Sequence, residues 1–270
     1  MATMILDATF IFIFGLLIGS FLNVVILRLP HGQTLLGRSM CPHCKYILRP
    51  IDLVPIFSFL YLRGRCRQCA KPISWRYPLL EFLVASLYVT AYVIITPTDF
   101  IGYLLLLQVL VAVAVCVATF VIDLEHYLIL DVVTLAGVGL ALCIKVMLAI
   151  FDHQVVWSTH SFIFTSFLGV LAGFVPFFLL WFFSRGKLMG FGDVKFMVFA
   201  GLVLGWPVIV VALLLAFWLG ALVSVPLLLM GKKKFQSKLP FGTFLATAVI
   251  IALFCGSSLW QWYTSLLGVR

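Results

Sequence analysis

Long apolar runs constrain this chain more than any other feature of its sequence. A hydrocarbon core about 30 Å thick is crossed by a helix of about 20 apolar residues. Backbone polar groups find no water in lipid, so an apolar run that crosses it has to be helical. Apolar runs lie at about 5–27, 78–96, 100–122, 127–151, 161–183, 194–206, 208–230 and 243–267. We therefore expect an all-α polytopic membrane protein with about eight transmembrane helices.

The composition excludes the main soluble classes. Apolar residues make up 64% of the 270 residues and charged residues only 10%, whereas a soluble domain is about 25% charged. A soluble enzyme, a nucleic-acid-binding protein, a disordered chain and a secreted disulfide scaffold are all excluded. The net charge of +9 is better explained by membrane topology than by an acidic partner, so no nucleic acid is expected.

The basic residues indicate how the chain is oriented in the bilayer. Of the 18 Lys and Arg residues, 16 fall on alternate loops, as expected for loops that face the cytosol. Nine of them lie in the stretch 28–77, and Lys232, Lys233, Lys234 and Lys238 follow the seventh run. The intervening turns, such as 152–160, contain none. With eight spans, both termini are expected outside the cytosol. The expected organisation is a first transmembrane helix at 1–27, a cytosolic loop at 28–77 and a seven-helix membrane domain at 78–270.

Four of the seven cysteines lie in the cytosolic loop as two CxxC pairs. They are Cys41 and Cys44, then Cys66 and Cys69. Two such pairs about twenty residues apart are typical of a tetrahedral zinc site with four thiolate ligands. Cytosolic thiols stay reduced, which disfavours the alternative of two redox or disulfide pairs. Four thiolates leave no position for water, so we expect a structural zinc ion that folds the loop.

Carboxylates near the membrane are the candidates for catalysis. An ionisable residue in a membrane span is costly, so it marks a functional site by default. Asp123 ends the third run, and Asp193 follows two glycines at the start of the sixth, so both are expected near the cytosolic face. Two carboxylates sharing one proton can activate a water and protonate a leaving amine, as in aspartic proteases. A carboxylate-dependent membrane transporter would also place acids in its helices, and it remains an alternative. Glu125 is expected to be solvated, and Glu81 and Asp131 are left without a chemical role.

These motifs together resemble the type IV prepilin leader peptidases, a family of bacterial membrane aspartic proteases with a GxGD motif. The resemblance covers nearly the whole chain. It rests on GSFLNVVI at 19–26 with RLP at 28–30, the double CxxC loop, RYPLLE at 76–81, the segment from Asp123 to Asp131, GFGDVK at 190–195, and LPFG at 239–242. Two positions depart from the family pattern, because Leu130 and Thr243 stand where proline is frequent. Both departures concern local turn geometry.

The resemblance implies an endopeptidase that removes the basic leader of prepilins or pseudopilins at the cytosolic face of the bacterial inner membrane. Asp123 and Asp193 would be its catalytic residues. Members with the four-cysteine loop are typically bifunctional and also N-methylate the new N-terminus, with S-adenosylmethionine as methyl donor. No residue that holds this donor can be read from the sequence, and neither can the oligomeric state. A non-catalytic, zinc-bearing membrane scaffold is the second alternative.

Overall fold

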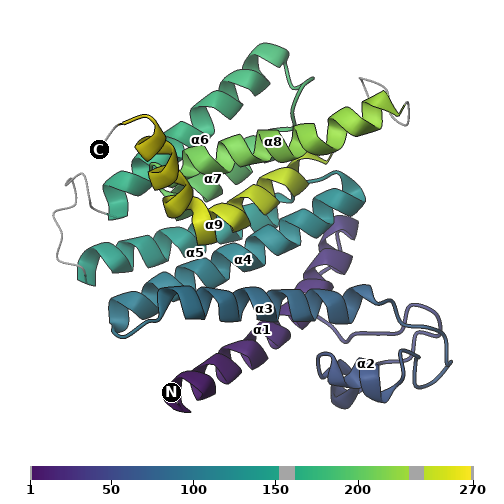
Figure 1. The fold of residues 1–270 in the computed structure, drawn as a ribbon. Coiled ribbons are helices and arrows are strands. Elements are labelled where there is room, and N and C mark those ends of the chain that lie inside the picture. The colour runs from purple at the N-terminus through teal and green to yellow at the C-terminus, as the bar shows by residue number, and fades with distance from the viewer. Residues whose placement is uncertain (1, 152–161, 231–239, 269–270) are drawn as a thin grey trace. The chain divides into compact units, whose positions relative to one another are not determined.

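The computed structural model describes residues 2–151, 162–230 and 240–268, and every regular element in these residues is a helix (Figure 1). The chain divides between Thr96 and Pro97 into two compact units. The segments predicted at 152–160, at Lys232, Lys233, Lys234 and Lys238, and at Leu239 lie outside the described residues.

The first unit consists of two long helices and the loop that joins them. Helix α1 (Ala2–Arg28) packs along α3 (Arg76–Ile95). The loop holds two short 3-10 helices, η1 (Leu29–His31) and η2 (Pro50–Leu53), and the one-turn helix α2 (Phe57–Tyr61). A Cβ atom added at Gly15 would lie 2.6 Å from Cα of Ala85, and one at Gly19 would lie 2.7 Å from Cα of Glu81. These two glycines therefore let the helices touch backbone to backbone.

The second unit is built around a short helix. Its helices are α4 (Phe100–His126), α5 (Asp131–Phe151), α6 (Phe162–Ser184), α7 (Phe191–Leu204), α8 (Val208–Leu229) and α9 (Phe241–Leu266). Helix α7 contacts each of the other five. Val194, Phe196 and Phe199 on α7 have no exposed surface. This helix is the core of the unit.

The crossing of α6 and α7 depends on two facing glycines. A Cβ atom added at Gly201 would lie 2.4 Å from the backbone oxygen of Gly169, and one at Gly169 would lie 2.5 Å from that of Gly201. Just beyond the crossing, the Trp206 N–H donates a hydrogen bond of 2.8 Å to the Thr165 carbonyl. Helices without side chains at their contact gain close van der Waals packing, which is the main attraction between helices in lipid.

The expectation of an all-α membrane protein is confirmed, with seven helices in the described residues long and apolar enough to cross a bilayer. The remaining predicted span, the run at 194–206, corresponds to α7, which has 14 residues. At 1.5 Å per residue it is about 21 Å long, short of a full hydrocarbon core. It ends at Gly205, whose φ of 68° breaks the helix. The predicted run 127–151 begins as a helix only at Asp131, because Tyr127 adopts the left-handed conformation that ends α4.

We predict that Gly201→Val prevents stable folding of the second unit. The added side chain meets backbone atoms of α6, which cannot rotate away, so overpacking should lower the free energy of unfolding by about 3 kcal/mol. Gly139→Val on α5 is the matched control, because nothing lies within 4 Å of a Cβ atom there. Thermal unfolding of both variants in detergent, followed by size-exclusion chromatography, measures the difference. Equal stability of the two variants would contradict the proposed crossing.

Candidate active site and metal centre

The loop of the first unit brings its four cysteines together. The sulfur atoms of Cys41, Cys44, Cys66 and Cys69 all lie within 4.8 Å of one another. Two similar turns produce this arrangement. The N–H of Lys45 donates to the Cys41 carbonyl at 3.0 Å, and the N–H of Ala70 donates to the Cys66 carbonyl at 2.9 Å.

This donor set fits a tetrahedral metal ion. Zn–S bonds of about 2.3 Å place the sulfur atoms of a tetrahedron about 3.8 Å apart, and Cys41 Sγ lies 3.9 Å from Cys69 Sγ. The four-cysteine cluster can therefore hold a zinc ion.

An ion pair between the buried Asp52 carboxylate and the partly exposed Arg67 side chain supports the same loop. The Arg67 side chain donates two hydrogen bonds, of 2.9 and 2.7 Å, to Oδ1 of Asp52. The Arg49 N–H donates to Oδ2 at 3.1 Å. Burial raises the pKa of Asp52, but the hydrogen bonds from Arg67 and Arg49 outweigh it, so the pKa lies below its usual value. Asp52 thereby connects η2 to the second CxxC turn.

Glu81 joins α3 to the loop. Its carboxylate is 7% exposed and accepts a hydrogen bond of 2.8 Å from the Ile56 N–H. Ile56 has a φ of 59°, which is costly for a β-branched residue. The hydrogen bond therefore supports a strained turn, and in this unit Glu81 has a structural role.

Asp123 lies in the last turn of α4, where its carboxylate meets the beginning of α9. Its side chain is buried, and Oδ2 accepts two hydrogen bonds from Thr243, one from the backbone N–H at 2.7 Å and one from Oγ1 at 3.2 Å. Thr243 is the third residue of α9. The first N–H groups of a helix have no partner within the helix. The Asp123 carboxylate supplies one.

Glycines make this approach possible. A Cβ atom added at Gly242 would lie 3.0 Å from Cγ of Asp123 and 2.8 Å from Cδ1 of Ile129. One added at Gly192, at the start of α7, would lie 2.9 Å from Cβ of Ile129. The beginnings of α7 and α9 therefore converge on Ile129, just beyond the end of α4.

Asp193 enters this junction from α7. It is the third residue of that helix, is 8% exposed, and accepts a hydrogen bond of 3.2 Å from the Gly190 N–H. Its neighbour Gly192 packs against Ile129, as does Gly242, which also packs against Asp123. The structure thus places the two candidate catalytic aspartates, both buried, at the same junction of α4, α7 and α9.

Asp131 and Lys195 form an ion pair beside the aspartates. Nζ of Lys195 lies 2.7 Å from Oδ2 of Asp131 and 5.1 Å from the centre of the Phe191 ring. The pair connects the first turn of α5 to the first turn of α7. Glu125 lies on the exposed side of α4, with Oε2 4.0 Å from Nε2 of His126.

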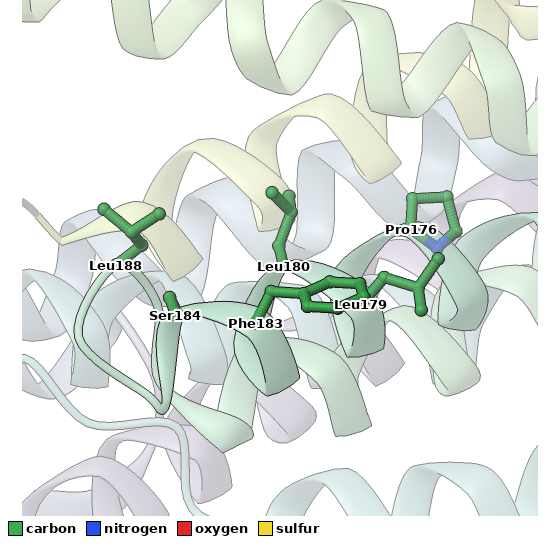
Figure 2. A pocket seen from close by; sticks show the side chains of 6 residues that line it. All are labelled: Pro176, Leu179, Leu180, Phe183, Ser184 and Leu188. Carbon is green, nitrogen blue, oxygen red and sulfur yellow. The ribbon is translucent and has the colours of Figure 1, made fainter.

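A shallow depression along α6 contains none of the candidate catalytic or metal-binding residues. Figure 2 shows its lining, which is apolar apart from Ser184. The lining residues are Pro176, Leu179, Leu180, Phe183, Ser184 and Leu188. No titratable group is among them, so the depression cannot perform acid–base chemistry.

The chain matches two known domains. Residues 13–95 match the bacterial peptidase A24 N-terminal domain, and residues 110–225 match the type IV leader peptidase family. The chain is 35% identical over 283 residues to the prepilin leader peptidase/N-methyltransferase of Aeromonas hydrophila, a match that covers 94% of this chain and 92% of that protein. The protein of the same name from Legionella pneumophila is 32% identical over 279 residues, with 93% and 92% covered. No solved structure matches the chain.

The chain belongs to the type IV leader peptidase family. The resemblance expected from the motifs is therefore confirmed. The N-terminal match contains the four cysteines and Glu81, and the second match contains Asp123, Asp131 and Asp193. Thr243 lies beyond both matched segments.

Thr243 is the site residue that sequence reasoning missed. In the sequence, Thr243 stands out only because proline is frequent at this position in the family, which points to turn geometry and not to a contact with Asp123. Its hydrogen bonds to a residue 120 positions earlier depend on how α4 and α9 pack. The available signal was the short segment Pro240-Phe241-Gly242, because Pro and Gly before an apolar run mark a helix start whose N–H groups need an acceptor.

We predict that Asp131 and Lys195 are energetically coupled. Exposed ion pairs contribute up to about 1 kcal/mol, and here the side chains are 54% and 31% exposed. A double-mutant cycle with Asp131→Asn and Lys195→Met should give a coupling of about 0.5–1 kcal/mol that weakens at high salt. The measurement is unfolding in detergent at two salt concentrations. Glu125→Gln combined with Lys195→Met serves as the control and should be additive.

Proposed function

We propose that this chain is a membrane aspartic endopeptidase that removes the leader of type IV prepilins or pseudopilins and then N-methylates the new N-terminus. The observation that carries the proposal is the buried pair Asp123 and Asp193, which lie at the same junction of α4, α7 and α9. Relatives that match over nearly the whole chain bear the name prepilin leader peptidase/N-methyltransferase.

The two aspartates have the arrangement that peptide hydrolysis needs. Two like charges in a site of low dielectric disfavour each other, so the pair holds one proton between its members. The charged carboxylate removes a proton from a water molecule, whose oxygen attacks the scissile carbonyl. The neutral carboxyl donates its proton to the leaving nitrogen as the C–N bond breaks.

The substrate fits the position of this site. A prepilin has a basic leader followed by an apolar helix, so its scissile bond lies where the membrane meets the cytosol. The distribution of Lys and Arg assigns the segment between α1 and α3 to the cytosolic side. We assign Asp123 and Asp193 to the same side, and both chain termini to the outer side, of a multi-pass protein of the bacterial inner membrane.

A structural zinc ion is the best explanation of the loop at 28–77, which we treat as a unit between the first helix and a membrane domain at 78–270. Four thiolates saturate a tetrahedral zinc ion and leave no position for water or substrate. The loop has few buried apolar side chains, Phe59 among them. The ion would supply the stability that an apolar core supplies elsewhere.

The methyl donor fits the surface of the same loop. S-adenosylmethionine has a flat purine ring and a carboxylate, and it supplies an activated methyl group for transfer to an amine. A depression on the loop is lined in part by Phe59, Trp75, Arg63 and Arg65, with the two ring centres 4.8 Å apart. Aromatic rings suit a purine, and guanidinium groups suit a carboxylate. We propose that these residues hold the donor.

The two alternatives lack support. A transporter would need a polar path across the membrane, but Lys145, the charged residue farthest into α5, is buried with Nζ over the Phe162 ring at 5.6 Å. A non-catalytic scaffold would not need two carboxylates buried together, because such a pair is costly. The relatives of the chain carry the name of an enzyme.

We predict that Asp123→Asn or Asp193→Asn alone abolishes leader cleavage and leaves the protein folded. Either change removes one of the two proton-transfer partners, so the rate should fall by at least about 1,000-fold. The purified protein is incubated with a prepilin and S-adenosylmethionine, and intact mass reports leader loss and methyl addition separately. On a pre-cleaved pilin, the same variants should still transfer the methyl group.

Glu125→Gln is the matched control, because it removes an exposed carboxylate two residues from Asp123. It should cleave at the wild-type rate. Full cleavage by either aspartate variant would contradict the proposed dyad. A wild-type protein that never releases a leader would contradict the endopeptidase itself.

We predict one tightly bound zinc ion per chain. Replacing Cys41 and Cys66 by Ser takes one thiolate from each CxxC turn, so the ion should be lost. Metal analysis of fresh, reduced, untagged protein measures the stoichiometry. Replacing Cys143 and Cys255, which are exposed on α5 and α9, should leave the zinc content unchanged. Wild-type protein without zinc would refute the assignment.

A further inference from the structure

We infer that Asp123 is the charged member of the dyad and the general base, that Asp193 carries the shared proton, and that Thr243 is the positioning residue that sets this difference. The inference rests on the proposed function and goes one step further, because it assigns the two proton-transfer roles. It is carried by the hydrogen bonds that the two carboxyl groups receive.

The Asp123 carboxylate receives the stronger set of donors. Both Thr243 hydrogen bonds end on the same oxygen, Oδ2, and the backbone one is short at 2.7 Å. The backbone donor belongs to the first turn of α9, where the N-terminal end of the helix carries partial positive charge. Hydrogen bonds to a carboxylate favour its charged form.

The Asp193 carboxyl group receives a weaker set of hydrogen bonds. It also lies in a first turn, but the donor from Gly190 is 3.2 Å away. A negative charge on Asp123, at the same junction, disfavours a second negative charge on Asp193. When only one member of a pair can be charged, the member with more and shorter donors keeps the charge.

Other charges around Asp123 do not reverse this order. On its own helix, Glu125 is exposed and lies beside His126. From α5 and α7, Asp131 and Lys195 pair with each other at 2.7 Å. Helix α9 contains no Asp, Glu, Lys, Arg or His. The hydrogen bonds from Thr243 are therefore the main difference between the two carboxyl groups.

Thr243 gives this chain donors that a proline at the same position would lack. Proline has no N–H and no hydroxyl. The two hydrogen bonds occupy Oδ2 and leave Oδ1 of Asp123 for the water molecule. In the reaction, the water proton passes to Asp123 as the new C–O bond forms, and the Asp193 proton passes to the departing nitrogen. Proton exchange between the two carboxyl groups then restores the starting state.

The first test is infrared spectroscopy of the full chain in detergent, without substrate, over a series of pH values. A protonated carboxyl group gives a C=O stretch that a carboxylate lacks. In each single variant the remaining aspartate titrates without a charged partner, so we expect the band to disappear at a higher pH in Asp123→Asn, where Asp193 remains, than in Asp193→Asn, where Asp123 keeps its two donors. All proteins carry Glu81→Gln, which removes the other buried membrane carboxyl from the comparison. The reverse pattern, or no difference between the two variants, would overturn the assignment.

The second test separates the contributions of the backbone N–H and of the hydroxyl group at position 243. Thr243→Ser keeps both donors, Thr243→Val loses the hydroxyl, and Thr243→Pro loses both. Proline is tolerated in the first turn of a helix, so the last variant should fold. Loss of a hydrogen bond to a charged group changes an equilibrium or a rate by about 10- to 100-fold. We therefore expect kcat for leader cleavage to fall about 10-fold in the Val variant and about 100-fold in the Pro variant. KM should change little in either, and the Ser variant should match wild type.

A loss confined to KM, or wild-type kcat in folded Val and Pro variants, would overturn the role of Thr243. Thermal unfolding identifies any variant that fails to fold, and the Val variant alone then decides the outcome. Failure of the proposed function is distinguishable, because wild type would then not cleave a prepilin at all. The infrared comparison needs no cleavage and would still give its own result.

Discussion

A hydrocarbon interior offers no water to polar groups, so the backbone N–H groups at the start of a membrane helix are stabilised by an acceptor elsewhere in the chain. Much of the functional geometry follows from this constraint. The free N–H of Thr243 at the start of α9 finds the Asp123 carboxylate. At the opposite end of α7, the Trp206 N–H finds the Thr165 carbonyl. The ends of these helices thus become the places where polar groups of distant segments are joined.

Glycine is what lets these partners reach each other. At Gly242 and Gly192 the absence of a side chain brings the starts of α9 and α7 against Ile129, beside Asp123. At Gly169 and Gly201 it brings α6 against α7, so the helix that carries Asp193 is held along its length. The site is therefore positioned by the close approach of two helix starts to the Ile129 and Asp123 side chains and by the backbone contact between α6 and α7. Such support suits a pair of carboxyl groups that must remain within proton-transfer distance.

The sequence predicts the helices well because apolar length is a local property. The runs at 78–96, 208–230 and 243–267 correspond closely to α3, α8 and α9. The grouping of the four cysteines follows from spacing alone, since each CxxC pair sits in one turn. Helix ends are less predictable. Nothing in an apolar run marks the left-handed Tyr127 that ends α4, whereas Gly205 and Pro207 do mark the end of α7.

Contacts between distant helices could not be predicted in the same way. Asp123 and Asp193 were both expected at the cytosolic face, but depth alone does not place two groups side by side. Their meeting depends on how α7 and α9 pack against the end of α4, and so do the contacts of Ile129 and Thr243. The ion pair of Asp131 and Lys195 joins residues 64 positions apart for the same reason.

The two units solve the problem of stability by different means, and this difference shapes what each can do. The loop of the first unit has little apolar core, so it relies on its four cysteines and on the pairing of Asp52 with Arg67. Such interactions respond to metal, redox state and pH. The second unit relies on apolar contacts around α7, which respond to none of these. In the proposed mechanism, a few fixed hydrogen bonds set the protonation of the carboxyl pair in this unit. The charged, water-soluble cosubstrate would instead bind at the loop of the first unit.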